Sequence, residues 1–243
     1  MARTDLRDFY TGEAASYETV RYGSRYGRLF RVIHRNTIVK ILSSRQGWKN
    51  ALDVASGTGQ LLPPLLAATG LVVASDLTPA MLKVSRSNNE LQSKLAFCVA
   101  DATRLPYNSA SFEIVASARF LHLFEPDRQA ALIGEMARVL APDGLLIVDF
   151  YSLTSRKIFG PIIWAYRTLL RKRPENDYRV SGLVARKMVE AAGLKVVEVR
   201  GVGNFLLAPF SWLPQSWLLA VAYPLSGRFA ALSEQFVLVA SKP

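Results

Sequence analysis

The sequence predicts a single α/β domain built on a mostly parallel sheet of seven strands, with helices on both faces. Short apolar runs alternate with helix-like segments from residue 50 onwards, which is the pattern of parallel strands joined by crossover helices. The 243 residues, half of them apolar, are enough to bury a sizeable core. A glycine-rich turn joins the first apolar run to the helix-like segment that follows it, so the sheet is expected to carry a ligand site.

That turn lies in the stretch Ala51-Leu52-Asp53-Val54-Ala55-Ser56-Gly57-Thr58-Gly59-Gln60. We interpret residues 51–54 as a buried strand and residues 58–69 as the next helix. Glycines let the backbone approach a ligand closely in such a turn. Asp76 follows Gly59 by 17 residues, at the end of the next apolar run, which suits a carboxylate that accepts from ribose hydroxyls. The turn and the acid together predict a nucleotide-sized pocket.

The remaining elements follow from apolar periodicity and from helix-capping residues. Thr78 before Pro79 starts one helix, and Ser181 caps a short helix that stops at Gly193. Residues 151–178 form an insertion that contains an apolar helix-like piece, 158–170. The other expected strands are 71–75, 95–99, 112–117, 145–150, 194–200 and 235–241, and the other expected helices are 26–42, 79–92 and 127–140.

The net charge of +11 is unevenly distributed along the chain. Residues 1–50 carry +6 and residues 156–200 carry +7, whereas residues 51–155 carry −3. The basic flanks are either a solvated face or an attraction to an anionic surface or substrate. A solvated face requires no partner, whereas an attraction would bring in an anionic membrane surface as one.

The single cysteine, Cys98, excludes an intramolecular disulfide and fits a buried structural thiol in a reducing compartment. The first eight residues contain no apolar segment of the kind found in signal peptides. We therefore expect a cytoplasmic protein, with peripheral membrane contact as an open alternative.

Residues 201–227 form a charge-free span that is rich in aromatic and aliphatic side chains. Pro209, Pro214 and Pro224 divide it into pieces too short to cross a hydrocarbon core of about 30 Å. The span is either a cap over the substrate cavity or an interfacial element with Trp212 and Trp217 at the boundary.

The third glycine of the dinucleotide fingerprint is absent, because Leu61 and Leu62 occupy the relevant positions, and this argues against a dehydrogenase. The stretch around Gly57, together with Ser75-Asp76, Ala100-Asp101-Ala102, Leu105-Pro106 and Leu140-Ala141-Pro142-Asp143-Gly144, resembles the class I S-adenosylmethionine-dependent methyltransferases. The broad likeness is to those of ubiquinone and menaquinone biosynthesis, and it covers residues 50–150. It implies a Rossmann-like fold, S-adenosyl-L-methionine as the cofactor, and one domain in three parts: an N-terminal helical lid (1–49), a cofactor-binding core (50–150), and substrate-side insertions with closing strands under an apolar cap (151–243).

The resemblance also implies a role for each strand end. The glycine turn lines the methionine and ribose end, with Ala55 in place of the usual glycine. Asp53 faces the amino group, directly or through water, Asp76 takes the ribose diol, and Asp101 takes the adenine amino group. The Ala102 amide meets an adenine ring nitrogen. The cofactor-binding residues are then Asp53, Ala55, Ser56, Gly57, Thr58, Gly59, Asp76, Leu77, Asp101, Ala102 and Ser117, the last beside the methionine part.

Methyl transfer is an in-line displacement, to which positioning in a dry site contributes much. His122 follows the fourth strand and is a candidate base, with local packing or hydrogen bonding as the alternative. Tyr17 is a second catalytic candidate and, with Tyr10, could form a lid or simply pack on the sheet. His34 lies in the N-terminal helix and is a weaker candidate. No Cys/His cluster has metal-ligand spacing, so no metal is expected.

The leading prediction is methyl transfer to a small, apolar or lipid-like acceptor, such as a quinone precursor, a lipid or a secondary metabolite. RNA or protein methylation is an alternative that the basic flanks favour. Against it, the sequence has no appended RNA-binding motif and no Asn-Pro-Pro-Tyr-type tetrad after the fourth strand. A non-catalytic partner subunit that keeps the fold is a third possibility, which the intact turn and acids disfavour. The methylated atom and the oligomeric state stay open.

Overall fold

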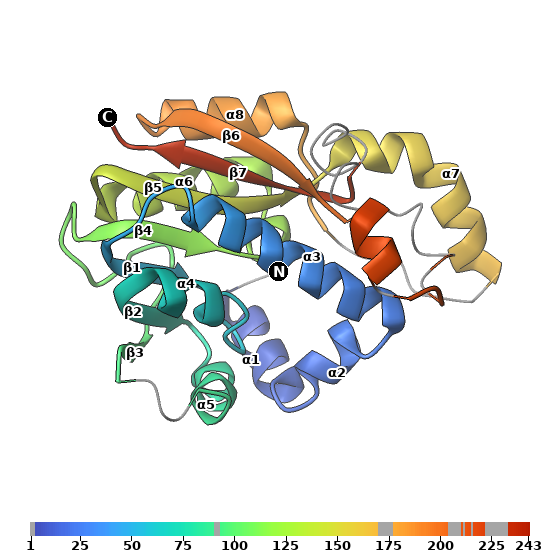
Figure 1. The fold of residues 1–243 in the computed structure, drawn as a ribbon, viewed down its shortest axis with the longest axis horizontal. Coiled ribbons are helices and arrows are strands. Elements are labelled where there is room, and N and C mark those ends of the chain that lie inside the picture. Colours follow the sequence, from blue (N-terminus) through green and yellow to red (C-terminus); the bar gives the residue numbers. More distant parts are fainter. Residues whose placement is uncertain are drawn as a thin grey trace.

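The computed structural model describes residues 3–89, 93–169, 177–203, 210, 212–214, 216–221 and 233–243. Seven strands form one sheet in the order β3-β2-β1-β4-β5-β7-β6 (Figure 1). β1 to β5 run parallel, and β7 runs antiparallel to both of its neighbours. The strands are β1 (Trp48–Val54), β2 (Thr69–Asp76), β3 (Leu95–Val99), β4 (Phe112–Ser117), β5 (Leu140–Tyr151), β6 (Lys195–Val202) and β7 (Gln235–Ser241). The predicted sheet is confirmed.

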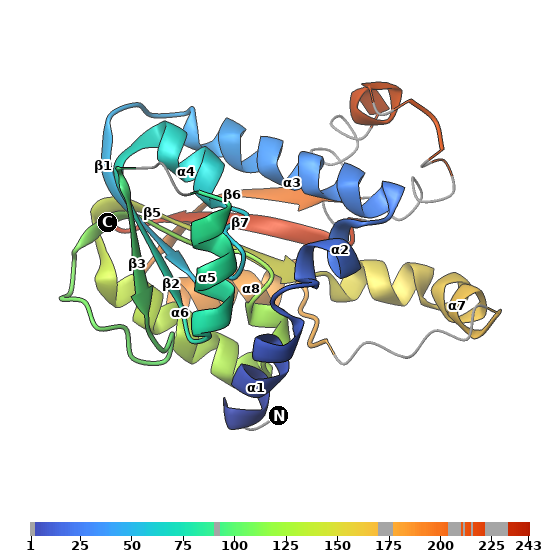
Figure 2. The same cartoon turned by 90° about the horizontal axis from the view of Figure 1, so that it is seen from below.

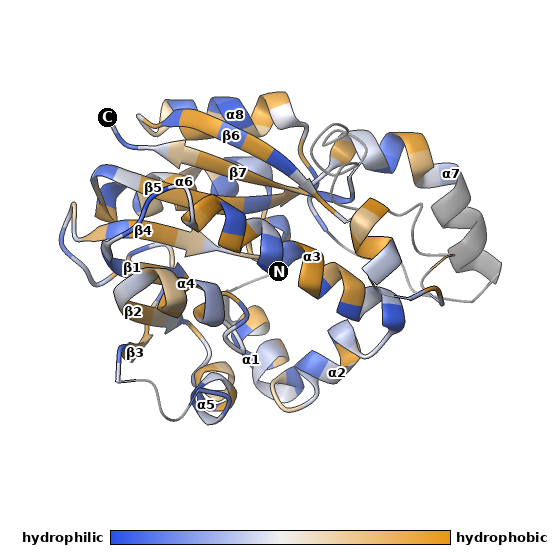
Figure 3. Cartoon of the chain, in the orientation of Figure 1, coloured by the Kyte–Doolittle hydropathy of each residue, from blue (hydrophilic) through white to orange (hydrophobic). Residues whose placement is uncertain are grey.

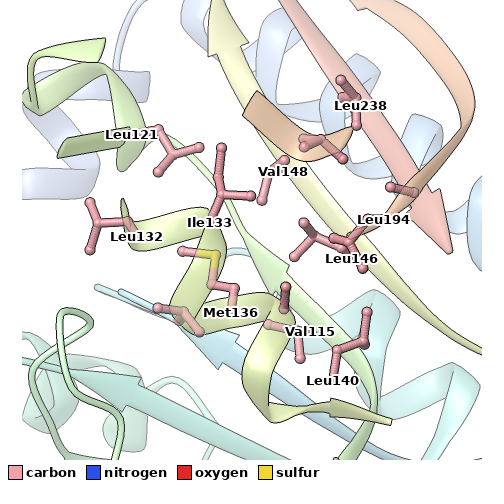
Figure 4. Close-up of a cluster of buried hydrophobic side chains, with 14 of the residues drawn as sticks. Val115, Leu121, Leu132, Ile133, Met136, Leu140, Leu146, Val148, Leu194 and Leu238 are labelled. Carbon is pink, nitrogen blue, oxygen red and sulfur yellow. The ribbon is translucent and has the colours of Figure 1, made fainter. Parts of the chain in front are cut away.

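Helices cover both faces of the sheet (Figure 2). One core lies between the sheet and the side of α3 and α4, and it includes Ile33, Leu62 and Leu65. A second core lies under α6 and α8 (Figure 4), and it includes Ile133 and Met136, neither of them exposed by more than 1%. The helices are α1 (Arg3–Glu13), α2 (Tyr17–Tyr22), α3 (Arg25–Leu42), α4 (Leu62–Ala68), α5 (Pro79–Ser87), α6 (Pro126–Val139), α7 (Leu153–Leu169) and α8 (Gly182–Ala191), with a short 3₁₀ helix η1 (Leu121–Leu123).

Hydropathy explains this layering (Figure 3). β4 and β7 are buried almost throughout, as expected of strands covered on both faces. α3 instead buries one stripe, which includes Leu29, Ile33 and Leu42, and its exposed surface is largely polar apart from Val39. Within the described residues, none of the helices has the length and apolarity needed to cross a membrane.

Several predicted boundaries were wrong, and two of them have a clear local reason. The helix expected from residue 58 begins only at Leu62, because Gly57 and Gly59 have left-handed φ values of 54° and 89° that a helix cannot include. The fifth strand, expected from residue 145, begins at Leu140, whose pairing with Phe112 extends the sheet. The helix predicted for 79–92 ends at Ser87, and the helical piece predicted for 158–170 already begins at Leu153. Much of the charge-free span, including Pro209 and Pro224, lies outside the described residues.

Candidate active site

The turn that leaves β1 is built by its own backbone and by β2. Ala55, Gly57 and Gly59 all have left-handed φ values, of 55°, 54° and 89°. The Ser56 amide donates to the Ser75 carbonyl at 3.0 Å, and the Gly59 amide donates to the Ser56 carbonyl at 2.9 Å. Ala55 stands where this motif usually has glycine. It adopts the left-handed conformation that a glycine would adopt, despite its Cβ.

Asp53 lies at the end of β1 and is 1% exposed. Burial raises the pKa of its carboxyl from 3.8 to about 7, even though the Ser56 hydroxyl donates to Oδ2 at 2.7 Å. A buried carboxyl of this kind gains from a cationic ligand, which would stabilise the ionised form. The geometry suits the amino group that the sequence assigned to it.

Asp76 joins the first turn to the end of β2. Its Oδ2 accepts from the Gly57 amide and its Oδ1 accepts from the Thr78 amide, both at 2.8 Å. Burial raises the pKa of the Asp76 carboxyl, and the two amide bonds oppose that rise. Each carboxylate oxygen has a second lone-pair direction, so a ribose hydroxyl could bond here without displacing an amide.

One open cavity gathers these strand ends. It contains ≈1130 Å³ of space between atoms, part of it open to solvent. Of the predicted cofactor-binding residues, its walls include Asp53, Ala55, Ser56, Gly57, Thr58, Asp76, Leu77, Asp101 and Ala102. Gly59 and Ser117 are not among the lining residues: Gly59 shapes the turn, and the Ser117 hydroxyl donates to the Val54 carbonyl at 2.8 Å.

Asp101 follows β3 at the far wall of the cavity. Its Oδ1 accepts from the Thr103 amide at 2.9 Å, and its backbone bridges to Arg104. This local turn holds the carboxylate and the neighbouring Ala102 backbone at the cavity edge.

The N-terminal helices close the opposite wall. Tyr10 of α1 and Tyr17 of α2 both line the cavity, with their ring centroids 6.2 Å apart in an edge-on contact. The Thr58 hydroxyl donates to Glu18 Oε1, and the Tyr22 hydroxyl donates to Gln60 Oε1 at 2.7 Å. α2 is therefore tied to the glycine turn by two side-chain hydrogen bonds. The sequence did not indicate Glu18 or Tyr22 as site residues, because hydrogen bonds between segments far apart in the chain produce no spacing pattern.

His122 lies in η1, beside the cavity but not among its lining residues. Its ring stacks on Tyr151 with centroids 4.1 Å apart, and it is 9% exposed. Burial first, and the Arg119 charge second, lower the pKa of the imidazole to about 3. The ring is therefore neutral at pH 7 and is a weak proton acceptor. Its Nδ1 is buried and has no hydrogen-bond partner in the part of the chain that the structure describes.

Arg119 also lines the cavity and was not predicted as a site residue. It has a left-handed φ of 56°, and its amide donates to Asp149 Oδ1 at 2.7 Å. The other Asp149 oxygen lies 3.3 Å from Nε2 of His34, and both side chains are buried. His34, a weak candidate in the sequence, thus supports the β4 turn. The sequence offered one signal for Arg119: a basic residue follows closely after a strand whose end borders the pocket.

The described residues contain no group of three or more His, Cys, Asp or Glu side chains arranged to hold an ion. The acids at the strand ends instead bond to hydroxyl and amide donors of the turns.

Comparison with known proteins agrees with this geometry. Residues 52–148 match a family model described as a methyltransferase domain. A ubiquinone/menaquinone biosynthesis C-methyltransferase of Pseudomonas putida is 34% identical over 161 residues, covering 62% of this chain and 61% of the relative. The corresponding Idiomarina loihiensis protein is 28% identical over 231 residues, covering 84% and 88%. This chain thus aligns with about three fifths of the Pseudomonas relative's length.

Solved structures show the same fold. Magnesium protoporphyrin IX methyltransferase from Synechocystis, crystallised with S-adenosylhomocysteine, superposes with a TM-score of 0.72 and 17% identity over 100% of both chains. The [4+2]-cyclase SpnF superposes with a TM-score of 0.57 and 17% identity, over 86% of this chain and 81% of that one. Because a cyclase shares the architecture, likeness at this level speaks for the fold and not for the reaction.

Residues 52–148 carry the methyltransferase domain. That domain, the relatives and the solved structures together support a class I S-adenosylmethionine-dependent methyltransferase, the family that the sequence resembles. By sequence, the chain is similar to the ubiquinone/menaquinone biosynthesis C-methyltransferases.

Proposed function

We propose that the protein transfers a methyl group from S-adenosyl-L-methionine to a small, largely apolar acceptor. The observation that carries the proposal is the meeting of Asp53, Asp76 and Asp101, from three different strands, with the glycine turn in one cavity. These groups match the amino, ribose and adenine parts of the cofactor. The cofactor supplies an electrophilic methyl group, and the chain supplies its orientation and a site shielded from water.

Calorimetry tests the cofactor site directly. S-adenosylmethionine or its demethylated product should bind without added metal. The Asp76→Ala variant should bind it more weakly by about 1.5–3 kcal/mol, the scale of a hydrogen bond to a charged group. Glu190→Ala, an exposed carboxylate on α8, is the matched control and should leave the affinity unchanged. Tighter binding of NAD than of S-adenosylmethionine would reject the proposal.

An apolar acceptor is supported by the side of the cavity near η1. Phe120, Leu123, Phe124 and Leu132 line it together with Leu6 of α1. Apolar walls favour a ring or chain and exclude water from the reacting atoms. The relatives named above act, by their names, in quinone biosynthesis or on a porphyrin, and both acceptors would suit such walls. A screen of quinone precursors, lipids and secondary metabolites with labelled cofactor is the measurement that names the acceptor.

His122 and Tyr17 are our candidates for the proton-handling groups. A neutral imidazole with a pKa of about 3 can accept a hydrogen bond from the hydroxyl group of the methyl acceptor, but it is a weak base for removing the proton of that hydroxyl. His122→Ala should lower turnover while leaving cofactor affinity nearly intact, and Tyr17→Phe tests the second candidate in the same assay. Full turnover in both variants would leave positioning as the main contribution of the chain.

We also propose reversible contact with an anionic membrane surface. Trp212 and Trp217 are each 66% exposed, and Phe210 and Val221 are each 51% exposed. Arg25, from the basic N-terminal region, donates to the Trp212 carbonyl at 3.4 Å, so positive charge lies beside the exposed rings. Near an anionic leaflet each Lys or Arg can contribute about 1 kcal/mol, screened within a Debye length.

Vesicle co-sedimentation tests this contact. Binding should require anionic lipid, fall with added salt, and weaken in the Trp212→Ala/Trp217→Ala double variant. The variant Lys40→Gln removes a positive charge from the same helix as Arg25. It distinguishes a general attraction of the basic chain to anionic lipid from the local contact at Arg25 and Trp212. Failure to bind anionic vesicles at low salt would reject the membrane contact and leave the transferase proposal standing.

A further inference from the structure

The turn after β3 forms one wall of the cavity, through residues 101–103 and Leu105. The sheet fixes the start of this turn, because the Ala100 amide donates to the Asp76 carbonyl at 3.0 Å. Within the turn, the Asp101 carboxylate accepts from the Thr103 amide at 2.9 Å. That bond spans two residues, so it shapes the turn without fixing where the turn ends.

Glu135, on α6, fixes the far end of the turn. Its Oε1 accepts from the Leu105 amide at 2.7 Å, across 30 positions of the sequence. Leu105 is buried, and a buried amide needs an acceptor. Here a side chain of the neighbouring helix supplies that acceptor in place of a strand. The position of the cavity wall just before Leu105 therefore depends on the Glu135 carboxylate.

Arg138, one turn further along α6, holds both this carboxylate and the chain beyond the cavity. Its guanidinium donates to Glu135 Oε1 at 2.8 Å and to Oε2 at 2.9 Å, a two-pronged contact. The same guanidinium donates to the Leu105 carbonyl at 3.1 Å and to the Tyr107 carbonyl at 2.9 Å. The Arg138 carbonyl accepts from the Ala110 amide at 2.9 Å. One arginine thus fixes residues 105–110 against the end of α6.

These bonds distinguish the pair from an ordinary helix ion pair. The Arg138 side chain is 36% exposed, and an exposed pair three residues apart contributes little by its charges alone. Neither Glu135 nor Arg138 lines the cavity, so any effect of the pair on a ligand must pass through the turn after β3. What the turn presents to the cavity is the Asp101 carboxylate and the Ala102 backbone.

We propose that Glu135 and Arg138 are positioning residues for recognition of the cofactor base. They hold the turn after β3 so that Asp101 and Ala102 meet adenine in preference to other purines. Adenine presents an amino donor where hypoxanthine presents a carbonyl, so a correctly placed carboxylate accepts from the first and is repelled by the second. The inference rests on the proposed function, which assigns the adenine edge to this turn.

Calorimetry with two nucleosides tests the positioning role. 5′-Methylthioadenosine and 5′-methylthioinosine share the ribose and the sulfur and differ in the base alone. The wild-type protein should prefer methylthioadenosine by about 10- to 100-fold, the ratio that one hydrogen bond to a charged group supplies. Glu135→Ala should reduce this preference to about threefold or less, mainly by weakening methylthioadenosine. A loss of stability alone would leave the ratio unchanged, because both nucleosides bind the same folded state.

Conservative variants and a control sharpen the test. Glu135→Gln keeps an oxygen for the Leu105 amide and should retain most of the preference. Arg138→Lys keeps the charge but cannot reach both carboxylate oxygens and both carbonyls at once, so its ratio should lie between those of the wild type and Glu135→Ala. Glu190→Ala, which removes a carboxylate paired with Arg186 on α8, should keep the wild-type ratio. If Glu135→Ala fails to fold, the Arg138→Lys ratio decides in its place.

The outcomes separate this inference from the proposed function. The positioning role is overturned, and the proposed function stands, if the wild type prefers methylthioadenosine and the folded variants keep that preference within about twofold. Equal binding of both nucleosides to the wild type would overturn base recognition by Asp101 and the positioning role with it. Binding of neither nucleoside would reject the cofactor site of the proposed function as well.

Discussion

The turns that leave the neighbouring strands β1 and β4 both line the cavity, but they are held in place by different contacts. Each contains a left-handed residue that is not glycine, Ala55 with φ 55° and Arg119 with φ 56°. The β1 turn bonds to itself and to β2, through Ser56, Gly57 and the Asp76 carboxylate. The β4 turn is anchored from outside by Asp149, which His34 contacts from α3.

The contacts that hold the β4 turn join residues much farther apart in the sequence than those that shape the β1 turn. Short polar residues and glycines close the β1 turn through bonds within the turn and to the neighbouring strand β2, so the main bonds that shape it come from one pair of adjacent strands. The β4 turn depends on a contact between His34 and Asp149, which are 115 residues apart. Its shape is fixed only when α3 packs on the sheet, and the Arg119 side chain then lies over the Tyr22 ring.

The largest expected effect comes from removing the outside anchor. Asp149→Ala leaves the Arg119 amide and the His34 ring without their partner, at about 1–3 kcal/mol for each buried group, so we expect a loss of about 2–5 kcal/mol in unfolding free energy. Asp149→Asn keeps an acceptor for the amide and should lose less. Urea denaturation measures both. A loss below about 1 kcal/mol for Asp149→Ala would show that the β4 turn is also self-sufficient.

The next largest effect is expected for a substitution in the β1 turn. Gly59→Ala places a Cβ 2.5 Å from Ser85 Oγ and 2.9 Å from Leu62 Cδ1, at a φ of +89°. Left-handed strain and overpacking together predict a loss of about 2–4 kcal/mol. Gly134→Ala in α6, where the new Cβ meets nothing within 4 Å, is the control and should hold or raise stability. Equal behaviour of the two variants would contradict a constrained β1 turn.

The carboxyl below the β1 turn predicts a pH dependence. The native pKa of Asp53, about 7, is above its ordinary 3.8, so the native state holds a proton that the unfolded chain has lost. The stability contributed by this group therefore falls as pH rises from about 4 to about 7, and is level above that. A cationic amino group prefers the ionised carboxylate, so cofactor affinity should rise several-fold from about pH 6 to about pH 8. Calorimetry of S-adenosylhomocysteine across that window should show the rise, and Asp53→Asn should abolish it.

The smallest effect concerns Ala55 itself. Replacing it with glycine relieves about 1–2 kcal/mol of left-handed strain but adds about 0.5–1 kcal/mol of unfolded-chain entropy, so stability should increase by about 0.5 kcal/mol. Ala110→Gly, at a φ of 57° outside the cavity, should gain a similar amount. Thermal denaturation resolves the two. Destabilisation by Ala55→Gly alone would mean that the Ala55 methyl group packs usefully in the turn.

The same contrast explains what the sequence could predict. The sheet and the β1, β2 and β3 ends were predicted because apolar periodicity and turn residues are local signals, and Asp53, Asp76 and Asp101 line one cavity as their spacing indicated. Arg119 was missed because its importance depends on Asp149 and Tyr22, which only tertiary packing brings near it. Tyr10 and Tyr17 were left undecided between lid and core, since an amphipathic helix shows which side is apolar but not what covers it.

The position of β7 has a consequence for how the sheet assembles. β7 inserts between β5 and β6, and all but the last of its residues are buried. β6 pairs with β7 along Lys195–Val202, so this edge of the sheet has no place to dock until residues 235–241 have arrived. Pairing of that span is non-local and entropically slow to nucleate. During synthesis on the ribosome, the cofactor-binding half of the sheet can form first. The β5 edge then stays exposed and prone to aggregation until β7 pairs with it.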